Sequence, residues 1–137
     1  MSSKIGVLLM NVGTPDAPDV PAVRRYLREF LSDRYVISLP YVARMLLLYG
    51  VILPFRPKRS AKAYQAVWTE QGSPLRVYSQ QCADTLQQVL GDGYRVVLGM
   101  RYGQPSLSEA VKALPVDCNE VVVVPLFPQY AQATTKT

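Results

Sequence analysis

Three short segments of the chain place arginine, tyrosine, serine or asparagine next to glycine and proline. They are residues 11–15, 101–106 and 128–135, and each follows a run of apolar residues typical of a buried strand. Guanidinium groups bind carboxylates in pairs of hydrogen bonds, and aromatic rings offer flat apolar faces. The segments therefore suit a flat ligand that carries carboxylates. The alternative is that Gly13 and Gly103 only permit turns and that Arg101 is a solvated strand end.

The residue types that are absent from the sequence limit the reactions that this chain could catalyse. No histidine occurs in the 137 residues, which removes the commonest general base and the commonest ligand for transition metals. The glycine-rich patterns of dinucleotide and nucleoside triphosphate sites and the G-x-S-x-G nucleophile pattern do not occur either. Any metal chemistry would need residues outside this segment.

The charge balance is basic, with 15 Lys and Arg against 10 Asp and Glu. An excess of five positive charges permits acidic partners of several kinds. Four of the cations fall within residues 56–62, but no aromatic side chains interleave with them as they do in proteins that bind single strands. The pattern favours a solvated start of a helix, and we expect no nucleic-acid partner.

The location of the protein is indicated by its cysteines and its apolar runs. Cys82 and Cys118 lack C-x-x-C spacing, which favours a reducing cytoplasm, and the first residues do not form a signal-peptide pattern. Residues 41–54 are almost wholly apolar but too short to span a bilayer. We expect a cytoplasmic protein, at most peripheral to the inner membrane, in which residues 41–54 form either a core helix or a membrane contact.

The remaining patterns predict strands that alternate with helices. Strands are expected at residues 4–12, 94–100 and 120–127. Helices are expected after Asp19, near residues 63–68, at 75–90 with an apolar face at positions 75, 78, 82, 86 and 89, and at 106–114. Alternation of this kind predicts a parallel α/β sheet with right-handed crossovers.

Six segments, in their order and spacing, resemble the ferrochelatase family. They are LLMNVGTPDAP, RRYLREFLSDR, GVILPFRPKRSAKAYQAVW, QGSPL, LGMRYGQPSL and VVVVPLFPQYAQATT. The resemblance implies two similar α/β halves, each a doubly wound, parallel four-stranded sheet flanked by helices. Residues 1–137 correspond to the N-terminal half, and the C-terminal half is expected to be missing from this chain.

The resemblance also implies the reaction. Ferrochelatases insert ferrous iron into protoporphyrin IX to form haem, the last step of haem biosynthesis. The His and Glu assigned to proton removal and iron delivery belong to the second half, so we expect no catalytic or metal-binding residue here and no activity of this chain alone. Two alternatives stay open: a non-catalytic porphyrin- or haem-binding module, and a chelatase for another metal and tetrapyrrole.

The resemblance also implies nine substrate-binding positions, which lie in the pocket wall, at its apolar lips or in contact with the porphyrin. They are Val12, Leu27, Phe30, Val36, Arg56, Tyr64, Ser73, Arg101 and Tyr102. Ala131-Gln132-Ala133 replaces the Ser-Cys-Ser of many relatives, so no iron–sulfur cluster is expected and Fe(II) is only a substrate. The expected partners are protoporphyrin IX, the missing C-terminal half, the membrane through residues 41–54, and a second copy of the chain through exposed apolar surface.

Overall fold

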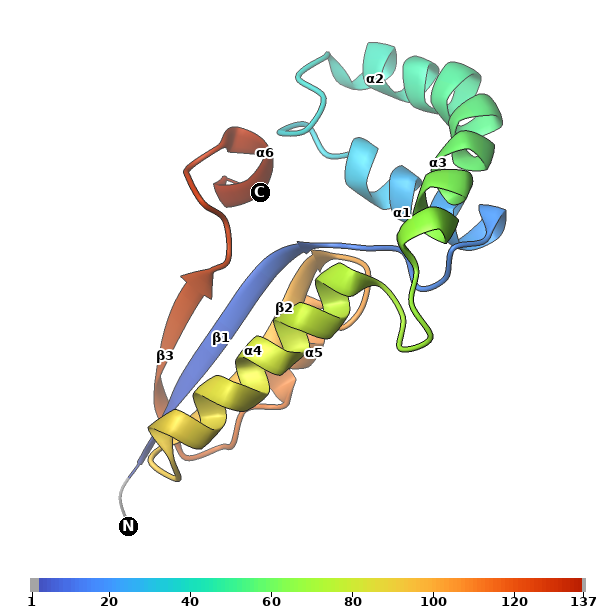
Figure 1. The fold of residues 1–137 in the computed structure, drawn as a ribbon. Coiled ribbons are helices and arrows are strands. Elements are labelled where there is room, and N and C mark those ends of the chain that lie inside the picture. The colour runs from blue at the N-terminus through green and yellow to red at the C-terminus, as the bar shows by residue number, and fades with distance from the viewer. Residues whose placement is uncertain (1–2, 137) are drawn as a thin grey trace. The chain divides into compact units, whose positions relative to one another are not determined.

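The computed structural model describes residues 3–136, which divide into two compact units. The first unit contains Met1–Gly13 and Leu75–Pro128, and the second contains Thr14–Pro74 and Gln129–Thr137. Figure 1 shows the strands of the first unit and the helical arc of the second. The chain thus leaves the first unit after its first strand and returns to it about sixty residues later.

The first unit is built on a parallel sheet. Its strands are β1 (Lys4–Gly13), β2 (Tyr94–Tyr102) and β3 (Cys118–Pro125), in the order β2-β1-β3. The predicted parallel α/β class and the three predicted strands are confirmed. The expectation of four strands is not met within residues 3–136, because the chain after β3 forms only the short helix α6 (Gln132–Thr135).

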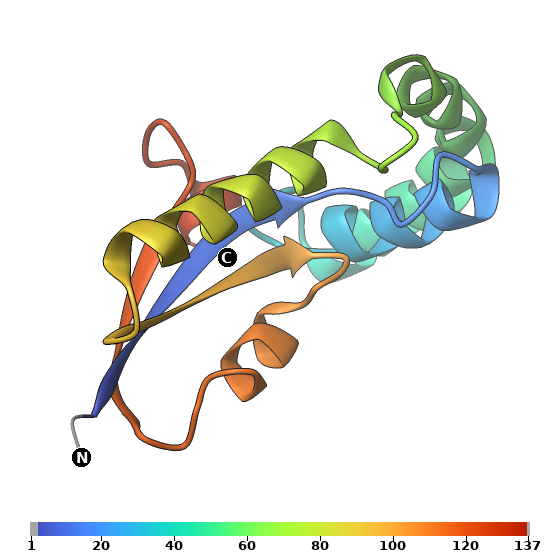
Figure 2. The same cartoon turned by 60° about the horizontal axis from the view of Figure 1, so that its bottom comes forward.

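Two helices cover opposite faces of this sheet, as Figure 2 shows. They are α4 (Pro74–Leu90) and α5 (Leu107–Lys112), and α5 begins at a capping box between Ser106 and Glu109. Successive side chains of a strand point to opposite faces, so β1 divides its residues between two core clusters. One cluster contains Val7, Leu9, Ala83, Leu98 and Met100, and the other contains Leu8, Val97 and Ala110.

The buried face of α4 differs from the predicted one. Ser79 and Ala83 are buried, whereas Tyr78 is 69% and Val89 is 76% exposed. Small side chains allow the helix to lie close to the sheet, and Asn11 Nδ2 donates a hydrogen bond of 3.1 Å to Ser79 Oγ. Most of the apolar positions that the periodicity assigned to the core therefore face outward.

The burial predicted for the valine-rich strand is also wrong. Val121, Val122, Val123 and Val124 of β3 are 37–51% exposed. β3 is an edge strand of this sheet, and both core clusters take their buried residues from β1, β2, α4 and α5. Burial of a strand depends on its neighbours as well as on its own composition.

The second unit begins with α1 (Val20–Leu31), the helix predicted after Asp19. A carboxylate oxygen of Asp19 accepts a hydrogen bond of 2.8 Å from the backbone N–H of Ala22. The buried residues of the helix are Ala22, Val23, Tyr26, Leu27 and Leu31. Its three arginines lie on the exposed side.

Three helical segments then follow one another without a break in Figure 1. They are α2 (Tyr41–Leu47), the π-helix η1 (Leu48–Ile52) and α3 (Leu53–Val67). Pro57 lies inside α3 and has no N–H, so the carbonyl of Leu53 loses its usual helical partner. Nε of Arg24 donates to that carbonyl oxygen at 3.4 Å. A contact from α1 thus gives this carbonyl a donor where α3 continues through the proline.

The core interpretation of residues 41–54 is wrong for most of its large apolar side chains. Tyr41, Val42, Leu46, Tyr49 and Val51 are 55–70% exposed. The buried residues are Leu48, Leu53 and, unexpectedly, Arg44, whose Nη1 donates to the carbonyl of Leu39 at 2.9 Å. Within residues 3–136, no helix is long and apolar enough to cross a membrane.

Candidate functional site

The first group of predicted site residues lies at the carboxyl ends of β1 and β2. Asn11 pairs with Met100 and Gly13 pairs with Tyr102, so Val12 and Arg101 lie between these paired positions on neighbouring strands. The guanidinium carbon of Arg101 is 4.8 Å from the centre of the Tyr102 ring. Ligands of open parallel sheets bind beyond these strand ends. Val12 and Arg101 thus combine an apolar side chain with a cation at the expected edge.

Gly13 brings the two strand ends together. Its φ is 123°, and a Cβ at this position would overlap the backbone carbonyl oxygen of Tyr102. Only glycine allows so close an approach in this conformation. The turn interpretation of Gly13 therefore holds, and the same glycine allows β1 and β2 to stay paired as far as Tyr102.

The second group lies in the second unit, where α3 carries Arg56 and Tyr64. Arg56 is exposed, and Tyr64 is half-buried with its ring edge-on to Trp68 at 6.3 Å between centroids. Burial raises the pKa of the Tyr64 phenol above its ordinary value of 10.0, and the charge of Arg56 opposes this shift. At neutral pH the phenol is therefore an uncharged group that can donate or accept a hydrogen bond.

The other predicted residues of this unit differ in access. Phe30 is half-buried and stacks on Tyr26, with ring centroids 5.9 Å apart, and Val36 is also half-buried. Leu27 is 5% and Ser73 is 4% exposed. Their side chains therefore face the interior of the unit.

The nine predicted positions divide between the two units. Val12, Arg101 and Tyr102 belong to the first unit, and the other six belong to the second. Leu27, Ser73 and Tyr102 are buried, while the remaining six have accessible side chains. The accessible residues are two arginines, one tyrosine and three apolar residues.

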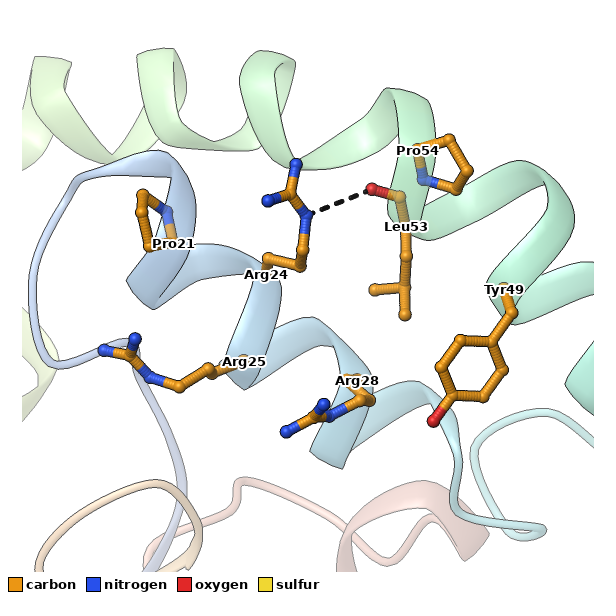
Figure 3. A pocket seen from close by; sticks show the side chains of 7 residues that line it. All are labelled: Pro21, Arg24, Arg25, Arg28, Tyr49, Leu53 and Pro54. Carbon is orange, nitrogen blue, oxygen red and sulfur yellow. Dashed lines mark hydrogen bonds between the residues drawn. The ribbon is translucent and has the colours of Figure 1, made fainter.

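A pocket that sequence reasoning missed lies between α1, η1 and α3. Figure 3 shows its seven lining residues: Pro21, Arg24, Arg25, Arg28, Tyr49, Leu53 and Pro54. Its volume is about 510 Å³. No role was predicted for these arginines from the sequence. Three cations within five residues, with no acidic residue in the first turn of α1, could have indicated an anion-binding face.

The described residues offer little for binding a metal. Among residues 3–136, no three His, Cys, Asp or Glu side chains lie close enough together to hold an ion. Cys82 and Cys118 are free thiols, the first exposed and the second half-buried.

Comparison with known proteins gives consistent matches. The family model described as Ferrochelatase matches residues 4–137. A ferrochelatase of Coxiella burnetii (strain CbuG_Q212) is 56% identical over 135 residues, and one of Legionella pneumophila (strain Corby) is 53% identical over 130 residues. These matches cover 98% and 95% of this chain. The chain spans only 38% and 39% of the length of these relatives.

Proposed function

The chain belongs to the ferrochelatase family, and from that premise we propose that the protein inserts ferrous iron into protoporphyrin IX to form haem. Residues 1–137 supply one wall of the porphyrin cleft. The observation that carries the proposal is the family match over residues 4–137, together with arginine and apolar side chains at the strand ends and on α3.

The chemistry of the substrate fits the accessible residues. Protoporphyrin is a broad apolar disc with two propionates, so a site needs apolar walls and a few cations. Val12, Phe30 and Val36 provide apolar surface. Arg56 and Arg101 provide guanidinium groups for the propionates, which they bind through charge-assisted hydrogen bonds. The other three members of the set, Leu27, Ser73 and Tyr102, are buried and offer a ligand little side-chain surface.

Metal insertion also requires proton transfer. The two pyrrole N–H groups lose their protons to a base as Fe(II) forms bonds to the four nitrogens, and no electron is transferred. No histidine occurs in residues 1–137 to act as this base. We assign proton removal and iron delivery to the part of the protein that lies outside this chain, and we expect residues 1–137 alone to be inactive.

The binding step is tested by comparing the free acid of the porphyrin with its dimethyl ester. The full-length product of the gene is titrated with each compound, and quenching of its intrinsic fluorescence is followed. We expect the free acid to bind about tenfold or more tightly, because each charged hydrogen bond contributes about 1.5–3 kcal/mol. Arg101→Gln should reduce this preference for the free acid. Arg95 is an exposed arginine at the opposite end of β2, and Arg95→Gln should leave the preference unchanged. Equal binding of acid and ester by the wild type would contradict the proposal.

A membrane contact forms the second part of the proposal. The exposed apolar side chains of α2, η1 and the start of α3 suit the boundary between headgroups and acyl chains. We assign the protein to the cytoplasm, bound peripherally to the inner membrane through this segment. Leu46→Ser with Phe55→Ser should weaken flotation with vesicles of phosphatidylcholine. Unchanged flotation would contradict the contact.

A further inference from the structure

We propose that the pocket lined by Arg24, Arg25 and Arg28 binds the phosphate of an anionic phospholipid headgroup, which makes the membrane contact selective for anionic bilayers. This inference rests on the membrane contact proposed above. It adds a defined site and a preferred class of lipid to that contact.

The pocket has an apolar interior and a cationic rim. Leu53 is 7% exposed and extends into the pocket from α3, and Pro21 and Pro54 add further apolar surface. In Figure 3 the side chains of Arg25 and Arg28 extend toward the same side, and the hydroxyl of Tyr49 points toward the side where Arg28 lies. A volume of about 510 Å³ is within the range of small-molecule sites.

One arginine is held in place by the fold. Nε of Arg24 donates to the backbone carbonyl of Leu53, the group that Pro57 leaves without its helical donor. This bond spans the pocket from α1 to α3, as the dashed line in Figure 3 shows. The terminal nitrogens of Arg24 stay available for an anion. Because the bond already restricts this side chain, less conformational entropy is lost when the anion binds.

The lining of the pocket carries three positive charges and no negative one. None of its seven lining residues has a carboxylate. Arg24 and Arg28 are four residues apart on α1, and like charges at this spacing destabilise a helix. An anion in the pocket would relieve this repulsion. Guanidinium groups match phosphate because they can donate two parallel hydrogen bonds to it.

The surroundings favour a lipid over a soluble anion. Tyr49 lines the pocket and is 56% exposed, and the neighbouring Val51 and Phe55 are 55% and 74% exposed. A bilayer offers phosphates at the depth where such side chains meet the acyl chains. The same segment can therefore insert its apolar side chains while the adjoining arginines reach the headgroups.

The experiment measures flotation of the full-length gene product with two kinds of vesicle. One kind contains phosphatidylcholine alone, and in the other part of it is replaced by phosphatidylglycerol. Arg24→Gln, Arg25→Gln and Arg28→Gln are combined in one variant. The matched control combines Arg76→Gln, Arg95→Gln and Lys112→Gln, which removes the same charge from exposed positions of the first unit. A second variant, Arg25→Gln with Arg28→Gln, preserves the Arg24 bond to Leu53 and with it the packing of α1 on α3.

We expect the triple variant to lose about tenfold or more of its binding to phosphatidylglycerol vesicles, since each cation near an anionic surface contributes about fivefold. Binding to phosphatidylcholine should be unchanged, and the control should lose much less. An equal loss of binding in the control would show that only the net charge matters, and it would contradict the proposed site. The apolar variant Leu46→Ser with Phe55→Ser tests the underlying membrane contact separately, because it should weaken binding to both kinds of vesicle.

A last arm distinguishes lipid from a soluble anion. Inorganic phosphate is added without vesicles, and thermal unfolding is followed in the wild type and the triple variant. A negligible shift in both supports the lipid assignment. The opposite outcome is that phosphate stabilises the wild type but not the triple variant, and that the wild type shows no preference for phosphatidylglycerol vesicles. That outcome would assign the pocket to a soluble anion and overturn the proposal.

Discussion

The hydroxyl of Thr14 donates a hydrogen bond of 2.8 Å to the hydroxyl of Ser73, and both residues are buried. The two positions are 59 residues apart in the chain, and the bond joins the start of the second unit to its exit before α4. The sequence suggested a ligand contact for Ser73. Its hydrogen bond to Thr14 gives it a structural role in closing the helical unit.

This bond can be tested by a double-mutant cycle. Ser73→Ala leaves a buried hydroxyl on Thr14 without its partner, so we expect the free energy of unfolding to fall by about 1–3 kcal/mol. Thr14→Val combined with Ser73→Ala removes both polar groups and should be less destabilising than the sum of the single changes. Urea unfolding of the four proteins gives the coupling energy. Strict additivity would show that the bond contributes nothing.

Gly13 provides a second test of the strand ends. Gly13→Ala combines a strained positive φ, which costs about 1–3 kcal/mol, with overlap against the carbonyl of Tyr102. We expect a large fall in melting temperature or failure to fold. Gly50→Ala is the matched control, because it is helical with no atom near its added Cβ, and should stabilise by about 0.5–1 kcal/mol. Equal melting of Gly13→Ala and wild type would refute the close approach.

Tyr64 should make stability fall at alkaline pH. Its pKa is raised in the folded state, mainly by burial, above the ordinary value of 10.0, so the folded protein holds this proton more tightly than the unfolded chain. The stabilising contribution is complete below pH 10.0 and is lost as the pH rises through the folded pKa. Tyr64→Phe should remove this loss of stability at alkaline pH. The control Tyr78→Phe keeps Tyr64, so its stability should still fall. Urea unfolding at a series of alkaline pH values measures the free energy of unfolding of each protein. The same dependence of this free energy on pH in the wild type and in Tyr64→Phe would contradict the account.

The exposed edge strand should promote self-association of the isolated chain. β3 pairs with β1 alone among the described strands and presents four exposed valines. Such edges act as templates for pairing with another chain. We expect gel filtration of residues 1–137 to show larger species as concentration rises, and Val122→Lys with Val124→Lys to shift the profile toward the monomer. A monomer at every concentration would argue against this.

Much of the fold was predictable because its signals are local. Asp19 caps α1 as its position before the apolar run indicated, and β1 begins at Lys4 as predicted. Both features depend on residues close together in the chain: a side chain that reaches a nearby N–H, and a run of β-branched residues. The parallel order of the strands followed from the alternation of strands with helices.

Burial was predicted less well because it depends on partners distant in sequence. The face of α4 that packs on the sheet contains Ser79 and Ala83, whose small size matters only once the sheet is in place. The valines of β3 look like a core strand, yet the strand lies at an edge. The continuation of α3 through Pro57 likewise involves Arg24, 33 residues earlier in the sequence, and no local pattern reveals it.

The candidate site likewise contains some features that the sequence predicts and others that depend on packing. Arg101 and Val12 could be placed at the carboxyl ends of strands from the sequence, and the register confirms that they lie on neighbouring strands. The arginine pocket escaped prediction because α3 supplies one of its walls. Side chains that look solvated on a single helix became pocket residues only through packing.

Iron insertion is the most direct test of the central claim. The full-length gene product is mixed with protoporphyrin IX under exclusion of oxygen, ferrous iron is added, and the fluorescence of free porphyrin is followed. We expect an iron-dependent loss of fluorescence, a rise of about tenfold or more in the porphyrin KM for Arg56→Gln with Arg101→Gln, and normal kinetics for the charge-matched control Arg76→Gln with Arg95→Gln. No iron-dependent loss in the wild type would contradict the claim that this protein is an iron chelatase.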